Sequence, residues 1–279
     1  MTSHRITEND THYWIYNDDL KLPTIVIIHG FRGTHHGLDL VAKSLNEYRI
    51  IIPDLPGFGK TEPLNDTHSL HNYVNWLKKF IMELHFEEPP FLMGHSFGSI
   101  ITSSYATRRP ESIAKLILVN PIGAPALSGP KAVVTKLATL YYWLGKILPS
   151  KLAIRWLSSK AIVLIMSSIL AKTRDKKTRR YIHDQHLTHF SSFANNRSLI
   201  EAYETSIKHN VRESAPHVFV PTLIIAGDRD DITPINKQYE LAEMFPKAEI
   251  KVIREVGHLT QYEKPDEVAG YIKEFITAK

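Results

Sequence analysis

The chain has 279 residues, of which 43% are hydrophobic and 23% charged, and it contains no cysteine. This composition is typical of a globular protein, and the missing cysteine excludes disulfides, thiolate metal sites and a cysteine nucleophile. The formal net charge is +5, but residues 122–215 alone hold 15 Lys and Arg against 5 Asp and Glu, so the basic excess lies in one segment.

The apolar runs predict a layered α/β fold. Short apolar runs that end in a turn signal predict buried strands, and apolar residues at helical spacing predict helices. The first half gives an edge strand at 11–18, strands at 24–30, 49–57, 90–98 and 113–121, and helices at 37–47, 69–86 and 97–109. The pattern resumes with strands at 221–228 and 248–256 and helices at 234–245 and from Pro265. Such alternation is typical of a mostly parallel central sheet flanked by helices.

Residues 122–215 interrupt this alternation, because they show helical patterns only. Candidate helices lie at 131–148, 151–171 and 196–211. We therefore predict an α/β core made of residues 1–121 and 216–279, with residues 122–215 inserted as an all-helical cap. The longest apolar stretch, 161–171, is shorter than the roughly 20 residues that cross a bilayer. The polar first ten residues lack the apolar segment of a signal peptide, so we expect a cytoplasmic protein.

A nucleophile motif follows the predicted strand at 90–98. Gly94, Ser96 and Gly98 fit the pattern G-x-S-x-G, and a predicted helix begins directly after them. In this context a strained turn presents a serine hydroxyl at the amino end of a helix. The two glycines lack Cβ atoms and let the chain bend tightly. The motif predicts Ser96 as a nucleophile.

A serine hydroxyl needs a base to remove its proton, and the base needs an acid to hold its tautomer. His258 follows the last predicted strand, and Asp228, Asp230 and Asp231 follow the strand before it. We favour Asp230 as the acid, because it lies far enough into its loop to reach a histidine above the sheet. The chain order serine, aspartate, histidine suits a hydrolase triad.

These segments resemble the α/β-hydrolase superfamily, in its capped branch of carboxylesterases, lactonases and carbon–carbon bond hydrolases. The resemblance rests on His29-Gly30-Phe31, on the D-x-x-G-x-G segment at 54–59, and on the glycines that precede Asp230 and His258. It implies an oxyanion hole formed by the backbone N–H groups of Phe31 and Phe97. Epoxide hydrolases and haloalkane dehalogenases of the branch attack with a carboxylate, so the serine here argues against both activities.

The resemblance also implies that the cap covers the serine and supplies most of the substrate pocket. We expect this pocket to include His29, His95, Tyr141, Tyr142, Trp143 and Trp156. Apolar walls of this kind favour a hydrophobic acyl or alcohol group. Each cap aromatic can equally serve to pack the cap against the core.

The basic run 172–180 follows the most apolar helix pattern of the cap. This order suits a weak contact with an anionic membrane surface or the attraction of anionic substrates, but we favour a solvated charged turn. No nucleic-acid motif accompanies the charge, so nucleic acid is not an expected partner. The histidines and carboxylates lack metal-ligand spacing, and we predict neither a metal nor another cofactor.

Together these features predict a serine hydrolase that cleaves an ester-type bond of a small, largely apolar molecule through an acyl-enzyme. The same triad would serve a lactonase, an amidase or a carbon–carbon bond hydrolase. A ligand-binding receptor that keeps the fold without turnover is an alternative of another class. The residues leave these alternatives open.

Overall fold

A single eight-stranded sheet forms the centre of the molecule, in the order β1-β2-β4-β3-β5-β6-β7-β8. The computed structural model describes residues 1–279 except residues 7, 126–131 and 279. The strands are β1 (Thr2–Arg5), β2 (His12–Tyr16), β3 (Thr24–Ile28), β4 (Arg49–Pro53), β5 (Phe91–His95), β6 (Leu116–Val119), β7 (Thr222–Gly227) and β8 (Ala248–Ile253). The strands from β3 onward run parallel to one another, whereas β2 pairs antiparallel with both β1 and β4. The predicted mostly parallel sheet is confirmed.

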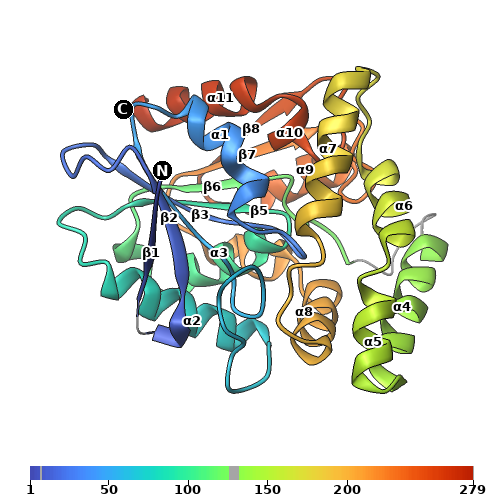
Figure 1. The fold of residues 1–279 in the computed structure, drawn as a ribbon. Coiled ribbons are helices and arrows are strands. Elements are labelled where there is room, and N and C mark those ends of the chain that lie inside the picture. Colours follow the sequence, from blue (N-terminus) through green and yellow to red (C-terminus); the bar gives the residue numbers. More distant parts are fainter. Residues whose placement is uncertain (7, 126–131, 279) are drawn as a thin grey trace.

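Helices cover both faces of this sheet (Figure 1). The core helices are α1 (Asp39–Ser44), α2 (Leu70–Glu83), α3 (Phe97–Arg108), α9 (Ile235–Met244), α10 (Thr260–Glu263) and α11 (Pro265–Thr277). Short 3-10 turns lie at η1 (Glu8–Asp10), η2 (His35–Leu38), η3 (Pro110–Ser112), η4 (Val211–Glu213) and η5 (Ala215–His217). The α1–α11 pair packs on one face, and α2 and α3 pack on the other.

The apolar run of β3 explains why this strand lies at the centre. Ile25 and Ile27 point to the core beneath α1 and α11, while Val26 and Ile28 point to the core beneath α2 and α3. Successive side chains of a strand alternate between faces, so a strand buried on both faces needs a continuous apolar run. Helices therefore cover both faces of the sheet. A site can form instead at the carboxyl ends of the strands.

The predicted all-helical insertion follows β6. Its helices are α4 (Ala132–Ile147), α5 (Ser150–Leu157), α6 (Lys160–Leu170), α7 (Lys176–His189) and α8 (Asn196–Lys208). They stand together at one side of the sheet in Figure 1. The predicted strands and core helices are all present, and the fold class predicted from the sequence is confirmed.

Four elements differ from the sequence-based prediction. The single helix predicted at 151–171 breaks at Ser158–Ser159 into α5 and α6. Part of the basic run 172–180, which suited a charged turn, forms the first turn of α7, because the Asp175 side chain caps the helix by accepting from the Thr178 N–H at 2.6 Å. Strand β1 was not predicted at all, since its residues are polar and mostly exposed, and its pairing with β2 is what defines it. The prediction of an edge strand at 11–18 was therefore wrong about its position, because β2 lies between β1 and β4.

Candidate active site

Ser96 occupies a strained turn between β5 and α3. Its φ of 51° and ψ of −116° are unusual for a residue with a side chain. A Cβ on Gly94 would lie 2.3 Å from Thr102 Oγ1, and one on Gly98 would lie 2.3 Å from the carbonyl oxygen of Ile28. Glycine is therefore required on both sides of the turn, and the turn leaves Ser96 only partly buried.

Three side chains from separate strand ends form a continuous hydrogen-bonded line. His258, in the loop after β8, lies with Nε2 2.7 Å from Ser96 Oγ. Its Nδ1 lies 2.7 Å from Oδ2 of Asp230, in the loop after β7. When Nδ1–H donates to the Asp230 carboxylate, the neutral ring presents the Nε2 lone pair to the Ser96 hydroxyl. The geometry suits proton transfer from the serine.

Asp230 is buried in a ring of donors. Besides His258, its carboxylate accepts from Asn120 Nδ2 at 2.9 Å, from Thr233 Oγ1 at 2.5 Å, and from the backbone N–H groups of Ile232 and Thr233 at 2.8 and 3.0 Å. Burial alone would raise the pKa of Asp230, but the charge of His258 and the hydrogen bonds from His258 and Thr233 outweigh it and lower the pKa. The group is therefore held as a carboxylate.

The neighbouring aspartates have other partners. Asp228 accepts from the backbone N–H of Glu255 at 2.7 Å, and Asp231 binds Nζ of Lys172 at 2.5 Å. Among these three residues, Asp230 is the one that lies against His258. The structure thus brings together Ser96, His258 and the aspartate that the sequence analysis favoured.

The loop after β3 lies directly against the serine. A Cβ on Gly30 would be 3.2 Å from Ser96 Cβ, so a side chain at residue 30 would crowd the serine. Phe31 follows in this loop, and Phe97 is the first residue of α3, where a backbone N–H has no intrahelical acceptor. The Phe31 and Phe97 rings meet edge to face, with centroids 6.5 Å apart. Both backbone N–H groups thus belong to segments that border Ser96.

Two histidines predicted to line the pocket form hydrogen bonds with backbone groups near the site. His29 is buried and uses both ring nitrogens: Nδ1–H donates to the Gly30 carbonyl at 2.8 Å, and Nε2 accepts from the Leu55 N–H at 2.8 Å. His95 Nε2 lies 3.3 Å from the His258 carbonyl oxygen. Burial and the nearby His258 lower the pKa of His95 to about 3, so its ring is neutral. These contacts do not test the expectation that the two residues line the substrate pocket, which stays a prediction.

The four cap aromatics occupy different places. Tyr142 contacts the loop after β3, with its ring 5.7 Å from that of Phe31. Tyr141 and Trp156 pack within the cap, where Trp156 Nε1 donates to the Tyr141 carbonyl at 3.0 Å. Trp143 leaves 51% of its surface in solvent. Of the predicted pocket aromatics, Tyr142 is the one in contact with Phe31.

Arg32 is a functional candidate that the sequence analysis missed. It is buried and donates to the carbonyl oxygens of Leu157 at 2.8 Å and Phe190 at 3.0 Å, and to the Tyr142 hydroxyl at 3.3 Å. These acceptors all belong to the cap, whereas Arg32 directly follows Phe31. An arginine in a loop ordinarily indicates a solvated surface. Here it ties the cap to the loop beside Ser96.

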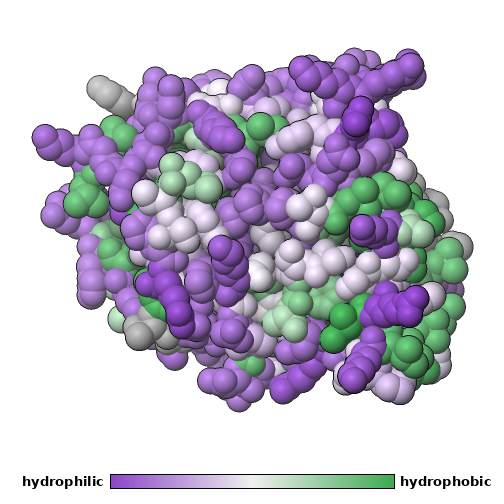
Figure 2. Space-filling view, in the orientation of Figure 1, coloured by the Kyte–Doolittle hydropathy of each residue, from purple (hydrophilic) through white to green (hydrophobic). Residues whose placement is uncertain are grey.

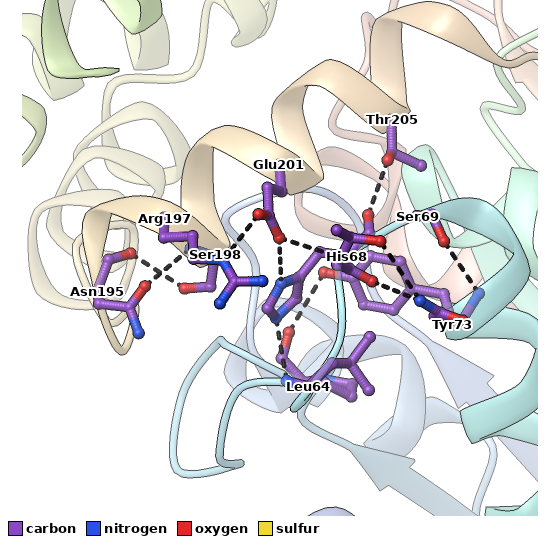
Figure 3. A network of polar contacts seen from close by, with 12 residues as sticks. Leu64, His68, Ser69, Tyr73, Asn195, Arg197, Ser198, Glu201 and Thr205 are labelled. Atoms are coloured by element: carbon purple, nitrogen blue, oxygen red, sulfur yellow. Dashed lines mark hydrogen bonds and ion pairs between the residues drawn. The ribbon is translucent and has the colours of Figure 1, made fainter. Parts of the chain in front are cut away.

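A pair formed by buried His68 and partly buried Glu201 anchors the last cap helix (Figure 3). Nδ1–H of His68 donates to Glu201 Oε2 at 3.1 Å, and its Nε2 accepts from the Leu64 N–H at 3.2 Å. Thr205 Oγ1 on the same helix, α8, donates to the His68 carbonyl at 2.7 Å. Both ring nitrogens of His68 are therefore occupied by the protein. This pair holds α8 against the core.

A cluster of three histidines lies near Asp54. The His36 ring is tilted against that of His35, with centroids 3.9 Å apart, and stacks on that of His189 at 4.0 Å. His35 Nδ1 lies 3.0 Å from Asp54 Oδ1. Within the residues that the structure describes, no group of three His, Asp or Glu side chains is placed to hold a metal ion.

Comparison with known proteins agrees with this architecture. Residues 23–265 match the family described as alpha/beta hydrolase fold, and the chain belongs to that family. It is 24% identical to Lipase 3 of Moraxella sp. (strain TA144), over 97% of this chain and 82% of that protein. It is 25% identical to a monoacylglycerol lipase of Mus musculus, over 92% of this chain and 76% of that protein. The chain is therefore an α/β-hydrolase related to lipases.

A solved structure shows the same fold. The enol-lactonase from Burkholderia xenovorans LB400 superimposes with a TM-score of 0.81 at 16% identity, covering 99% of this chain and 100% of that one. At this identity the likeness concerns the fold alone.

Proposed function

We propose that this protein hydrolyses carboxylic esters, with Ser96 as the nucleophile, His258 as the general base and Asp230 as the acid that orients His258. The observation that carries the proposal is the line of two 2.7 Å hydrogen bonds from Ser96 through His258 to Asp230. Nucleophile, base and orienting acid within hydrogen-bond distance are the signature of an activated serine.

The first half of the reaction would acylate the enzyme. Ser96 Oγ attacks the ester carbonyl carbon while its proton passes to His258 Nε2. The carbonyl oxygen becomes an oxyanion, which the backbone N–H groups of Phe31 and Phe97 would bind. One such donor is worth about 3 kcal/mol of transition-state stabilisation, because it is oriented before the charge develops. His258 then gives the proton to the departing alcohol.

The second half would release the acid. A water molecule takes the place of the alcohol, His258 removes a proton from it, and the resulting hydroxide attacks the acyl-enzyme. The proton returns to Ser96 Oγ as the carbon–oxygen bond to serine breaks. Throughout, Asp230 remains ionised and holds the His258 ring in one orientation, as its lowered pKa and its buried donors favour.

Two observations favour an ester of apolar character as the substrate. Phe31 packs against Tyr142 and against Phe97, the residue after Ser96, and aromatic rings of this kind suit an apolar acyl or alcohol group. In addition, the two relatives named above are lipases.

The test compares p-nitrophenyl esters with acyl chains of about two to about twelve carbons. Ser96→Ala should lower kcat by about 10⁴-fold or more, because it removes the nucleophile. Ser103→Ala is the matched control: its hydroxyl lies on the same helix and bonds the Ile100 carbonyl. Activity within about tenfold of wild type in Ser96→Ala would contradict the proposal.

A fluorophosphonate probe separates the nucleophile from the choice of bond. Mass spectrometry should find the label on Ser96, and His258→Ala should slow the labelling, because the base activates the hydroxyl. A protein that labels at Ser96 but leaves every ester intact would overturn the ester proposal and keep the nucleophile. Lactones, anilides and vinylogous diketones would then identify the bond.

A further inference from the structure

Helix α4 carries apolar side chains on both of its sides. Tyr141 and Tyr142 are buried, and Tyr142 contacts Phe31. The opposite side is exposed to solvent and carries four large apolar residues, Leu137, Leu140, Trp143 and Ile147. Leu137 alone leaves 63% of its surface exposed. A surface helix of a globular protein normally exposes polar residues to solvent. The exposed apolar residues of α4 therefore indicate a surface that binds a partner.

Helices α5 and α6 extend the apolar stripe. Their exposed apolar side chains are Leu152, Ile154, Trp156, Leu164, Ile165 and Ile169. Together with the four residues of α4 they form a surface that we call the apolar cap face. Figure 2 shows apolar side chains gathered over α4, α5 and α6, with hydrophilic ones scattered among them. Such a collection on one subdomain marks an interaction site.

Residues 150–170 have the composition of a membrane-spanning helix but do not form one continuous helix. Ser150–Leu170 is long and apolar enough to cross a bilayer, and only 22% of its most apolar window is buried. However, it breaks at Ser158–Ser159 into helices of 8 and 11 residues. Each is too short to span the roughly 30 Å hydrocarbon core. Helices of this kind are suited to lie in the plane of a membrane interface.

The charged side chains of the helices that form the apolar cap face are all basic, and one of them, Lys146, pairs with Glu204 of α8 at 2.7 Å. The sequence contains no Asp or Glu between Glu111 and Asp175. All charged residues of these three helices are basic, namely Lys136, Lys146, Lys151, Arg155 and Lys160. Apolar residues and tryptophans mixed with lysine and arginine match an interface between hydrocarbon and anionic headgroups.

We propose that the apolar cap face docks onto the surface of an anionic lipid bilayer. A second copy of the chain is a poorer occupant, because a symmetric contact would place the same cations against each other without a carboxylate from these helices to neutralise them. Docking would bring α4 to the lipid surface while its inner side stays in contact with Phe31. This binding requires no turnover and so goes beyond the proposed esterase activity.

The experiment is vesicle flotation of the full chain carrying Ser96→Ala, so that no hydrolysis alters the lipid. The vesicles are phosphatidylcholine alone, or phosphatidylcholine with about one-third phosphatidylglycerol. The chain should float with the anionic vesicles. Leu140→Gln/Ile147→Gln/Ile165→Gln should weaken this binding at least about tenfold, because it removes buried apolar area. Lys151→Glu/Arg155→Glu should do the same by reversing charge.

The matched control changes apolar residues that lie away from the cap and are at least as exposed, as Leu20→Gln/Met82→Gln/Phe219→Gln. It should bind like the parent chain, and circular dichroism should show that both triple variants are folded. Equal flotation of the two triple variants, equal binding to neutral and anionic vesicles, or no flotation of the parent would each overturn the proposal. A dimer that only the cap variant dissociates, without flotation of the parent, would instead make this face a contact between copies.

Discussion

Replacing Asp230 with asparagine tests the proposed orienting role at its most constrained point. The carboxylate accepts two hydrogen bonds at Oδ1, from the N–H groups of Ile232 and Thr233, and three at Oδ2, from Asn120, Thr233 and His258. Every partner donates. Asparagine offers one acceptor oxygen and one NH₂ donor. In either orientation of the amide, its NH₂ group must therefore face the donors that bond either Oδ1 or Oδ2 of the aspartate.

Both orientations of the amide should be costly. If NH₂ faces Ile232 and Thr233, two backbone donors lose their acceptor, which costs about 1–3 kcal/mol for the buried N–H of Thr233. If it faces His258 instead, Nδ1 must accept and the proton moves to Nε2, where it blocks removal of the Ser96 proton. In both cases the negative charge that stabilises the imidazolium is gone. We expect kcat to fall by about 10³- to 10⁴-fold, which is about 4–5.5 kcal/mol of barrier.

The assay is steady-state hydrolysis of the best p-nitrophenyl ester, with urea unfolding of the same samples. Most of the loss should appear in kcat, and the free energy of unfolding should drop by about 2 kcal/mol or more. Asp228→Asn is the control, since Asp228 lies in the same loop and accepts from the Glu255 N–H. Its kcat should stay within about threefold of wild type. If Asp230→Asn keeps more than about one tenth of wild-type kcat, the role assigned to Asp230 is refuted.

Three further changes probe the support of the site. Gly98→Ala places a Cβ 2.3 Å from the Ile28 carbonyl oxygen, so urea unfolding should show a loss of about 2 kcal/mol; an unchanged midpoint would contradict the close approach. Arg32→Met should keep the fold but raise KM and increase proteolysis of the cap, whereas unchanged kinetics and proteolysis would contradict the clamp. Burial lowers the pKa of His186 to about 3. Below about pH 6.5 the unfolded chain therefore binds a proton at this histidine, whereas the folded chain does not. The free energy of unfolding falls as the pH drops from there toward 3. His186→Gln should therefore lose up to about 1.4 kcal/mol less per pH unit than wild type between pH 6 and pH 4 by urea unfolding, and parallel pH profiles would contradict this.

The fold and the line of Ser96, His258 and Asp230 could be predicted because their signals are local. Continuous apolar runs indicate strands buried on both faces, and G-x-S-x-G marks the turn after one of them. Since parallel strands end at the same edge, residues just beyond two further strands had to lie near the serine. The separation of more than a hundred residues between Ser96 and His258 did not matter, because the sheet brings them together.

The supporting residues could not be predicted, because their partners are distant in sequence and their types are common in loops. Asn120 follows β6 and binds Asp230 across 110 residues, and Arg32 reaches Leu157 across 125. Neither residue belongs to a motif. The carboxyl end of β6 was the one available signal for Asn120, since that position borders the same edge of the sheet as the other site residues.

The cap shows where periodicity itself becomes ambiguous. Tyr141, Tyr142 and Trp143 are consecutive, and since a helix turns by about 100° per residue they cover more than half of its circumference. They cannot all face the serine, and an apolar pattern on every side does not indicate which side is inside. The tertiary contacts decide: Tyr142 stacks on Tyr203 with ring centroids 3.9 Å apart, and Trp143 is left outward. The aromatic residues that suggested a pocket therefore divide between the site and the apolar cap face, so substitutions of Tyr142 and Trp143 should separate ester hydrolysis from lipid binding.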